Sequence, residues 1–570
     1  MTTTCNTREL AAALGLPITT VTAAVEAATT AFAKDAKAFI GEATQSAGNI
    51  IFNNTPPAPE APAATSSAPV APVLPIILPP RVYEFNEMDN SRRFLAANAA
   101  DIRYVVDTGQ WLVWTGGRWE YDPAEALMLQ RAALAIRALT IEAQAVTASA
   151  KAAKDKEMRA LLEQKARAIT SFRDKSLSHR ALKAITALAS TDPSVRILSV
   201  ALDADPLLIG VKNGVVDLRT GRLIQATREQ LITRCAGTDF DPKAKAPHWE
   251  QHISLITRQS AGMAKYLQRA VGYSLTGTVV QEKMFQLVGN GLNGKSKFTG
   301  PLLRMFGTYG QKSPVAMLYD SKKDSGGPNS AHARMHGVRF ALMSEAKGVP
   351  VNEGFLKELT STEEQVARGL YVSEKEFKPT AHLWLTSNVP LMILGTDDGI
   401  WRRIDTVPFK HAFTMQDRDE HIEAKLLAEL PGILAWAVRG CLDYQREGLR
   451  LPSDLQAYNE EHRARMDSLG TFIGEQAITG GKYKATLADF YAAYCRYAEE
   501  RGEMPPKMRI ISERLERKGY EIRKSSVMTV YGVGLLADPA TQALSNTRPI
   551  QGNLGLRSGK CASHFPPSNT

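Results

Sequence analysis

Cysteine is scarce in this sequence: five residues lie far apart over 570 positions, with no C-x-x-C pair and no histidine cluster beside them. This spacing argues for a reducing compartment and against a structural zinc. Uninterrupted apolar runs are short, and none reaches the roughly 18 to 20 residues that a membrane span needs. The first ten residues, MTTTCNTREL, are too polar for a signal peptide. We therefore expect a soluble intracellular protein with no membrane partner.

Acidic residues are in deficit, with 59 Asp and Glu against 69 Lys and Arg, a net charge of +10 and a pI near 9.2. This balance favours polyanionic partners only weakly, because net charge bears on association and not on fold. The hydrophobic content of 44% and the charged content of 22% are ordinary for a globular protein. A chain of 570 residues is too long for one core, so about two to four domains are expected.

Charged residues are almost absent from 51–80, where Pro and Ala predominate. This composition predicts an extended linker. The Ala-rich segment 1–50 before it places two short helices around a Gly and a Pro. They could form a helix-turn-helix, but a plain helical hairpin or an oligomerisation element is favoured, because the second helix has no Arg or Lys to read a groove. The tail 537–570 is rich in Gly, Ser, Pro and Asn, so we expect it to be disordered.

Glycine gathers in FQLVGNGLNGKSKF, residues Phe285 to Phe298. The pattern Gly-x-x-x-x-Gly-Lys-Ser follows an apolar strand and precedes a helix-competent stretch, as a phosphate loop does. Lys295 is expected to reach the β- and γ-phosphates of ATP, and Ser296 to bind Mg²⁺. A Gly-rich hairpin with a chance Gly-Lys-Ser is the alternative. The nucleotide-binding candidates are Gly289, Asn290, Gly291, Leu292, Asn293, Gly294, Lys295, Ser296 and Lys297.

Hydrolysis also needs an acid that orients water, and two later apolar strands end in suitable residues. The segment VRFALMSEA supplies an apolar strand that ends in Glu345. We expect Glu345 to activate water and, with Ser296, to lie at the metal, while Ser344 at most assists the metal shell. AHLWLTSN ends in Asn388, whose carboxamide could hold water or the γ-phosphate. A strand that ends in Glu is common, so the order of the motifs carries this interpretation.

Two adjacent arginines, Arg402 and Arg403, precede the apolar strand in GIWRRIDTVPF. Such pairs are usually solvated or salt-bridged surface. Because this pair follows Asn388, which could sense the γ-phosphate, the more specific interpretation is an arginine finger presented to a neighbouring subunit. The charge that develops on the γ-phosphate in the transition state needs a cation from outside the loop. The catalytic candidates are Lys295, Glu345, Asn388, Arg402 and Arg403.

The motifs GNGLNGKS, ALMSE, FLKELTSTEEQVARGLY, EFKPTAHLWLTSN and GIWRRIDTVPF stand in an order that resembles the superfamily 3 helicases. The chain is most similar to the helicase part of phage and plasmid primase-helicases, a group that includes the poxvirus primase-helicase. Flanking stretches resemble the family's amino-terminal helicase-associated region and its carboxy-terminal winged helix. The resemblance covers about residues 85 to 535.

This resemblance implies an α/β fold with an AAA+-type P-loop core, an α-rich helicase-associated region and a winged-helix domain. It implies a homo-hexameric ring that moves along single-stranded DNA, gripped by a hairpin near GLYVSEKEFKP. Lys375 is the first DNA-binding candidate there, with Arg368 and Lys378 beside it; ordinary surface charge is the alternative for each. The implied domains are 81–248, 249–450 for the ATPase and 451–536 for the winged helix.

The segment PKMRIISERLERKGY predicts an amphipathic helix with a basic face. Such a helix suits DNA recognition, or it is simply a surface helix. Its DNA-binding candidates are Lys507, Arg509, Arg514 and Arg517.

Three features depart from the family pattern. STEE stands where Gly-Gly-Asp is more usual, and Lys297 stands where a hydroxyl residue is usual. Ahead of Tyr83 there is no cluster of carboxylates to hold the two metals of a primase. We therefore expect a helicase without primase activity, served by a separate primase or replication protein.

These observations predict an ATP-driven replicative DNA helicase of a phage, prophage or plasmid, acting on single-stranded and forked DNA in the cytoplasm of a bacterial host. The alternative is a DNA-binding ATPase switch, a replication initiator or regulator without processive unwinding. An inactive relative is disfavoured because the motif residues are all present.

Overall fold

The computed structural model describes residues 83–319, 332, 334–346, 349–367, 375–393, 395, 398–414, 419–502, 505–524 and 526–536. The helical segment expected at 1–50, the linker at 51–80 and the tail at 537–570 lie outside this range. The chain divides into two compact units, one of residues up to Met392 with Arg402–Gln456, and one of Ile393–Trp401 with the residues from Ala457 onward. Within the described ranges, none of the helices combines the length and hydropathy that a bilayer crossing needs.

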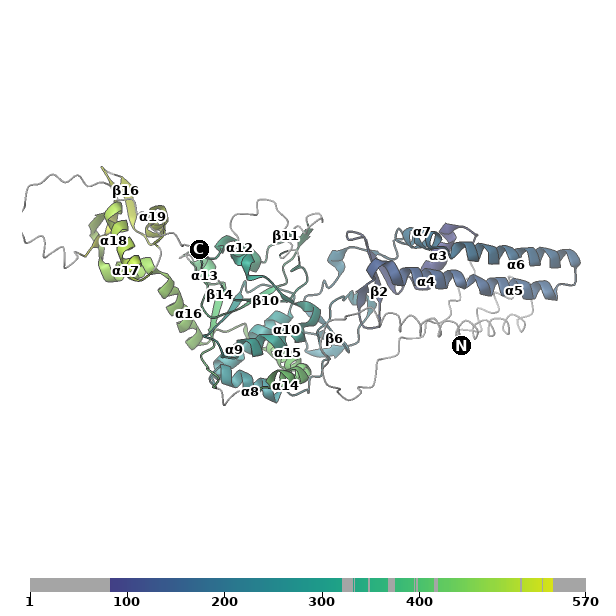
Figure 1. The fold of residues 1–570 in the computed structure, drawn as a ribbon, viewed down its shortest axis with the longest axis horizontal. Coiled ribbons are helices and arrows are strands. Elements are labelled where there is room, and N and C mark those ends of the chain that lie inside the picture. Colours follow the sequence, from purple (N-terminus) through teal and green to yellow (C-terminus); the bar gives the residue numbers. More distant parts are fainter. Residues whose placement is uncertain are drawn as a thin grey trace, which may run out of the picture. The chain divides into compact units, whose positions relative to one another are not determined.

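The first unit begins with a small sheet and a group of helices (Figure 1). The sheet has the order β3-β2-β1-β4 and includes β1 (Ile102–Val105), β2 (Gln110–Trp114), β3 (Trp119–Tyr121) and β4 (Arg196–Ile197). β2 and β3 form a hairpin around a Gly-Gly turn, and β1 adds an antiparallel strand on the other side of β2.

The helices are α3 (Glu87–Asn98), α4 (Ala126–Arg137), α5 (Leu139–Ala152), α6 (Lys156–Ser176) and α7 (His179–Ala189). They fit the α-rich region that the resemblance implies for 81–248, and their apolar faces share one buried core.

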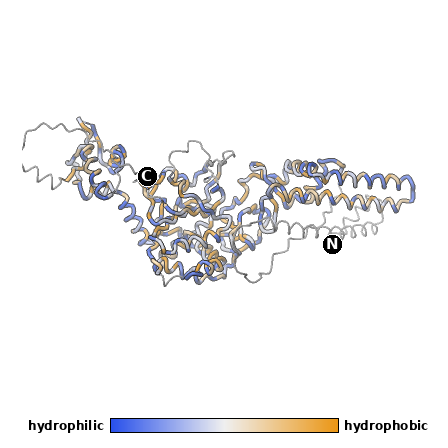
Figure 2. The backbone as a smooth tube through the Cα atoms, in the orientation of Figure 1, coloured by the Kyte–Doolittle hydropathy of each residue, from blue (hydrophilic) through white to orange (hydrophobic). Residues whose placement is uncertain are grey.

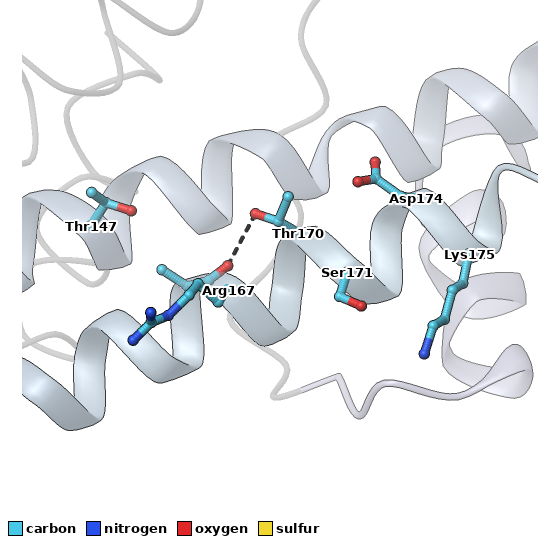
Figure 3. Close-up of a pocket in the computed structure, with 7 residues that line it drawn as sticks. Thr147, Arg167, Thr170, Ser171, Asp174 and Lys175 are labelled. Atoms are coloured by element: carbon cyan, nitrogen blue, oxygen red, sulfur yellow. Dashed lines mark hydrogen bonds between the residues drawn. The ribbon is translucent and has the colours of Figure 1, made fainter.

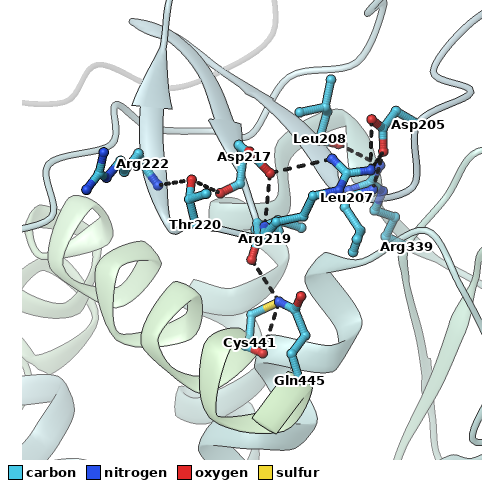
Figure 4. Close-up of polar contacts among 11 residues, drawn as sticks. Asp205, Leu207, Leu208, Asp217, Arg219, Thr220, Arg222, Arg339, Cys441 and Gln445 are labelled. Atoms are coloured by element: carbon cyan, nitrogen blue, oxygen red, sulfur yellow. Dashed lines mark hydrogen bonds and ion pairs between the residues drawn. The ribbon is translucent and has the colours of Figure 1, made fainter.

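A second small sheet joins this region to the rest of the unit. It consists of β5 (Leu208–Val211), β6 (Gly214–Asp217) and β7 (Arg222–Ile224), and an Asn213-Gly214 turn connects the first two strands. After β6, Arg219 bridges to Asp205 at 2.9 Å (Figure 4). The side-chain amide of Gln445, from α15 (Leu430–Glu447), donates to the Leu218 carbonyl at 2.7 Å. This contact attaches the small sheet to a helix of the central layer.

Five parallel strands form the central sheet, in the order β14-β8-β13-β10-β9. They are β8 (Met284–Val288), β9 (Gly310–Lys312), β10 (Phe340–Ser344), β13 (His382–Ser387) and β14 (Ile404–Pro408). β8 and β10 are apolar along most of their length, as is usual for strands of a parallel sheet covered by helices, whereas β9 (Gly-Gln-Lys) is polar and partly exposed. The α/β class expected from the sequence is confirmed at this level. All five carboxyl ends meet at one edge of the sheet.

The surrounding helices include α8 (Pro247–Ile256), α9 (Ala261–Leu275), α10 (Lys295–Phe306), α12 (Glu353–Thr360) and α14 (Ile422–Ala428). α9 packs directly against α15, and Gly272 makes this possible, because a Cβ there would lie 2.1 Å from the Cys441 nitrogen. The core around the sheet extends back to Ile209 and Val216 of the small sheet. Figure 2 shows hydrophobic residues concentrated in this central part.

β11 (Gln365–Ala367) and β12 (Lys375–Phe377) form an antiparallel pair between β10 and β13 in sequence. The hairpin expected between the second and third motifs is therefore present. Its connection, 368–374, lies outside the described residues.

The second unit contains α13 (Asp398–Trp401), most of α16 (Ser453–Met466), α17 (Ser468–Gln476), β15 (Ala477–Thr486), α18 (Leu487–Glu500), α19 (Met508–Arg517), β16 (Glu521–Lys524) and β17 (Met528–Leu535). Its strands pair antiparallel in the order β15-β17-β16. The predicted helix over PKMRIISERLERKGY is α19, and its buried face packs into an aromatic core.

One expectation about α19 is wrong. Arg514 does not lie on an exposed basic face, because its side chain is only 5% exposed. Arg514 precedes Leu515 and follows Ile511 by three positions, so it shares their side of the helix, which faces the core. Lys507, Arg509 and Arg517 are exposed as expected.

Candidate nucleotide site

The glycine loop connects β8 to α10 at the carboxyl edge of the central sheet. Gly289 follows β8 directly and has no room for a side chain, because a Cβ would lie 1.8 Å from Asn293 Nδ2 and 2.6 Å from the Phe409 carbonyl oxygen. Gly291 and Gly294 have φ values of +88° and +83°, in the left-handed region that glycine adopts without strain. The sequence predicted this strand, loop and helix, and the structure contains all three.

Lys295 is the first residue of α10, and its ammonium group lies inside the loop. Nζ donates to the Gly289 carbonyl at 2.6 Å and to Asn293 Oδ1 at 2.9 Å. Burial lowers the pKa of Lys295 from its usual value. Asn293 is itself buried, and its Nδ2 donates to the Phe409 carbonyl at 3.4 Å. The loop therefore holds a partly desolvated cation in a fixed position.

His252, on α8, supports the loop from outside, and the sequence interpretation missed it. Its ring is buried, and Nε2 lies 3.2 Å from the Gly294 carbonyl oxygen. The ring stacks on Phe413, with centroids 6.0 Å apart, while the Phe413 N–H donates to the Leu292 carbonyl at 3.0 Å. Burial lowers the pKa of His252 to about 4, so the ring is neutral near pH 7 and Nε2 acts as a donor to Gly294.

The two other strand-end candidates lie at the same edge as the loop. The Glu345 N–H, after β10, donates to the Thr386 carbonyl of β13 at 2.8 Å, and the Gly289 N–H donates to the Ser387 carbonyl at 3.3 Å. Asn388 directly follows Ser387, and β13 lies between β8 and β10 in the sheet. Glu345 has a φ of +66°, a conformation that is uncommon for a residue with a side chain and is often found at functional sites.

Glu345, Asn388 and Ser296 are all solvent-exposed at this edge. Ser344 is exposed too, and its Oγ accepts from Thr386 Oγ1 at 3.2 Å. Lys297 turns to the surface and pairs with Glu423 at 2.6 Å. The structure thus brings together Lys295, Ser296, Glu345 and Asn388, and it directs Lys297 elsewhere.

Arg402 and Arg403 lie at the opposite edge of the sheet. They precede β14, whose first residue Ile404 pairs with Met284, the first residue of β8. Both guanidinium groups approach one carboxylate oxygen of Glu282, at 2.8 Å and 2.9 Å. Their exposure differs, because the Arg402 side chain is 65% exposed and that of Arg403 is 11%. Neither arginine lies at the edge of the sheet that carries the glycine loop.

The DNA-binding candidates of the hairpin are only partly described. Arg368 lies outside the described residues. Lys375 begins β12, opposite Ala367, and Lys378 follows that strand as an exposed residue.

The loop edge suits a magnesium-bound nucleoside triphosphate. The position of Gly289 excludes any side chain, the loop ends at a helix N-terminus, and a buried ammonium group and an exposed hydroxyl stand in its first turn. Among the described residues, no three His, Cys, Asp or Glu side chains gather as a metal site. A metal held here would rely on Ser296, on Glu345 as the other candidate, and on the ligand's own oxygens.

Comparison with known proteins agrees with the motif order. The D5 N-terminal-like family matches residues 91–258. The chain is 26% identical over 298 residues to the provisionally named helicase L207/L206 of Acanthamoeba polyphaga mimivirus, which covers 49% of this chain and 31% of that protein. It is 24% identical over 379 residues to the provisionally named helicase 022R of Frog virus 3, covering 51% and 38%.

A provisionally named primase, C962R of African swine fever virus (isolate Tick/Malawi/Lil 20-1/1983), is 28% identical over 214 residues, covering 36% of this chain and 22% of that protein. The chain thus spans between about a fifth and two fifths of the length of these relatives. Among solved structures, the apo A form of the NrS-1 C-terminal region is 10% identical to this chain. The match covers 76% of this chain and 96% of that chain, with a TM-score of 0.42. The resemblance to superfamily 3 primase-helicases is confirmed by the family match and the viral relatives.

Proposed function

Because this chain carries a D5 N-terminal-like domain and is homologous to helicases and primases of large DNA viruses, we propose that it is an ATP-dependent DNA helicase of a replication system. The observation that carries the proposal is the meeting of the glycine loop, Glu345 and Asn388 at one edge of a parallel sheet. Strand β13 places Asn388 between the other two, which supports an AAA+-type arrangement of the core.

Each residue at this edge has a separate task in hydrolysis. The backbone of 289–294 and Lys295 would hold the phosphates of ATP, and the Ser296 hydroxyl would hold Mg²⁺, which neutralises charge that develops on the phosphates. Glu345 is exposed beside the loop, so its carboxylate can accept a proton from the attacking water. Asn388 can orient that water through its carboxamide. Residues 81–248, 249–450 and 451–536 remain the proposed domains.

The arginine pair supports assembly into a ring. A guanidinium group at the far edge of the sheet cannot serve the loop of its own subunit, but it can reach the loop of a neighbour in a head-to-tail ring. Of the two, Arg402 is the proposed finger, since its side chain is 65% exposed. Arg403, which is 11% exposed, is assigned to fixing Glu282 and the start of β14. A homo-hexamer is the proposed assembly.

The proposed DNA contacts lie in two places. The β11–β12 hairpin carries Lys375 and Lys378 and remains the candidate grip on single-stranded DNA. In the second unit, the order helix, strand, helix, helix, strand, strand from α17 to β17 supports a winged helix, with Lys507, Arg509 and Arg517 on the exposed side of α19. A separate primase is the proposed partner, and a phage, prophage or plasmid the proposed source.

Strand displacement tests the proposal. Wild-type protein with ATP and Mg²⁺ should release the labelled strand of a forked DNA duplex, and Lys295→Ala should not. Lys265→Ala, an exposed lysine of α9 away from the loop, is the matched control and should behave as the wild type. If the wild type hydrolyses ATP slowly and displaces no strand from any fork, the protein is an ATPase switch, and the helicase proposal is wrong.

A further inference from the structure

Helices α5 and α6 form a long hairpin whose outer surface has no role in the nucleotide site. α6 has 21 residues, so it extends about 31 Å at ~1.5 Å per residue. The two helices lie side by side (Figure 1), joined by a short turn in which Asp155 caps α6 by accepting from the N–H groups of Glu157 and Met158. Their apolar contact includes Val146 and Ile169, both buried, so the hairpin is well supported along its length.

Basic residues predominate on this hairpin. Between residues 139 and 176 the sequence has eight Lys and Arg and five Asp and Glu, which leaves a net charge of +3. Two of the acids are already engaged, because Asp155 caps α6 and Asp174 pairs with Arg173 at 2.7 Å. The hairpin therefore carries +3 of the chain's net charge of +10.

Three of these cations stand out by their position. Lys156, Arg167 and Lys175 are exposed, and among the described residues no carboxylate forms an ion pair with any of them, which is true of every Lys and Arg of this stretch except Arg173. Arg167 and Lys175 are separated by eight residues, which places them about 12 Å apart along the helix axis. Figure 3 shows Arg167, Ser171 and Lys175 projecting to one side of α6, at successive turns.

Hydroxyl groups lie between the two cations. Arg167 and Lys175 line an open cavity of about 700 Å³ together with Thr147 of α5 and Thr170, Ser171 and Asp174 of α6. Thr170 Oγ1 donates to the Ala166 carbonyl at 3.0 Å, while Arg173 compensates the charge of Asp174. Guanidinium, ammonium and hydroxyl groups are the side-chain donors that proteins place on phosphate oxygens of nucleic acids.

We propose that the α5–α6 hairpin is a nucleic-acid-binding surface that holds the sugar-phosphate backbone without reading its sequence. The linear spacing of the cations favours an extended polyanion over a compact anion. Thr147 and Thr170 already donate to the Ala143 and Ala166 carbonyls, so Ser171 is the hydroxyl between Arg167 and Lys175 that suits a phosphodiester oxygen. Exposed Met158 and Leu161 near the turn offer apolar surface for sugars or bases. The surface is separate from the β11–β12 hairpin and from α19, and its binding needs no ATP hydrolysis.

The salt dependence of binding tests this inference. Fluorescence anisotropy would follow a labelled 30-nucleotide single strand and a 30-base-pair duplex, without nucleotide, across a range of salt concentrations. The variant Lys156→Gln/Arg167→Gln/Lys175→Gln should bind at least about tenfold more weakly near physiological salt. The slope of log K against log salt should fall by about 2 for the single strand, since each lost phosphate contact removes ~0.7.

Two further variants make the result decisive. Lys265→Gln/Lys425→Gln/Arg446→Gln removes the same charge from exposed positions elsewhere and should leave affinity and slope unchanged. Lys156→Arg/Arg167→Lys/Lys175→Arg keeps the charge and should bind as the wild type even if the Gln variant is less stable. Unchanged slope and affinity in the Gln variant, or lost binding in the charge-retaining variant, would overturn the inference. The inference would also be wrong if the Gln variant lost binding to a labelled poly-glutamate chain but kept its DNA binding, because the surface would then serve an acidic protein segment.

A failure of the hairpin inference can be distinguished from a failure of the proposed helicase function. Lys295→Ala should retain the hairpin's contribution to DNA binding, and the hairpin Gln variant should retain ATP hydrolysis measured without DNA. A wild type that shows no ATPase activity, but whose DNA affinity falls in the Gln variant, would refute the motor and leave the hairpin surface standing.

Discussion

Replacing His252 by Phe tests how the phosphate loop is supported. The substitution keeps a ring in the stack with Phe413, whose interplanar angle is 13°. It removes the donor that lies 3.2 Å from the Gly294 carbonyl oxygen. A buried carbonyl left without its partner costs about 1–3 kcal/mol. At pH 7.5 we therefore expect the variant to lose about that much free energy of unfolding, and ATP to bind it more weakly because Gly294 is no longer fixed.

Lowering the pH should reverse part of this difference in the free energy of unfolding between the wild type and His252→Phe. The pKa of His252 is lowered from 6.5 to about 4 in the folded protein, chiefly by burial. Between these pH values the unfolded chain binds a proton that the folded chain does not, so this contribution to stability is present above pH 6.5 and is lost as the pH falls toward 4. A difference of about 2.5 in pKa corresponds to on the order of 3 kcal/mol.

Urea unfolding followed by far-ultraviolet circular dichroism, at pH 7.5 and pH 4.5, measures both effects. On acidification the wild type should lose about 2–3 kcal/mol more than His252→Phe, because the variant lacks this titrating group. His179→Phe, at an exposed histidine, is the control and should lose as much as the wild type. Equal acid losses in His252→Phe and the wild type would show that His252 is not buried and neutral as described, and would refute the reasoning.

Other predictions concern hydrolysis directly. Gly289→Ala should abolish binding of a fluorescent ATP analogue, because its Cβ would lie 1.8 Å from Asn293 Nδ2; normal binding would contradict the described loop. Glu345→Gln should retain nucleotide binding and lower the hydrolysis rate by about 10²- to 10⁴-fold, measured by phosphate release. Arg402→Ala and Lys295→Ala proteins should each be inactive alone. In an equal mixture, an interface is active when one subunit supplies Lys295 and its neighbour supplies Arg402, which holds for about one quarter of the interfaces. No recovery on mixing would exclude an arginine acting between subunits.

Local sequence signals were sufficient for the loop and for the strands that end in site residues. The spacing of Gly289, Gly294 and Lys295 fixes a backbone conformation within six residues, and the apolar runs before Glu345 and Asn388 are the buried strands β10 and β13. Because parallel strands bring their carboxyl ends to one edge, their side chains were expected to meet. The Asn213-Gly214 turn was likewise encoded by two adjacent residues.

Contacts between distant segments could not be predicted in this way. His252 lies 42 residues before Gly294 in the sequence, and no pattern in α8 distinguishes it from an ordinary core histidine. Arg514 occurs among exposed basic residues in the sequence, but its position on α19 turns it toward the core. The difference in exposure between Arg402 and Arg403 depends on Glu282, which is far from them in sequence. Each of these features is set by packing, which a single sequence does not display.

Hydrolysis of ATP, measured with and without single-stranded DNA, tests the central claim most directly. The wild type should hydrolyse ATP, DNA should stimulate the rate strongly, and Lys295→Ala should abolish both the basal and the stimulated rate while Lys265→Ala leaves them intact. Hydrolysis that is absent from the wild type, or that depends on neither DNA nor Lys295, would contradict the proposal of a DNA-coupled motor.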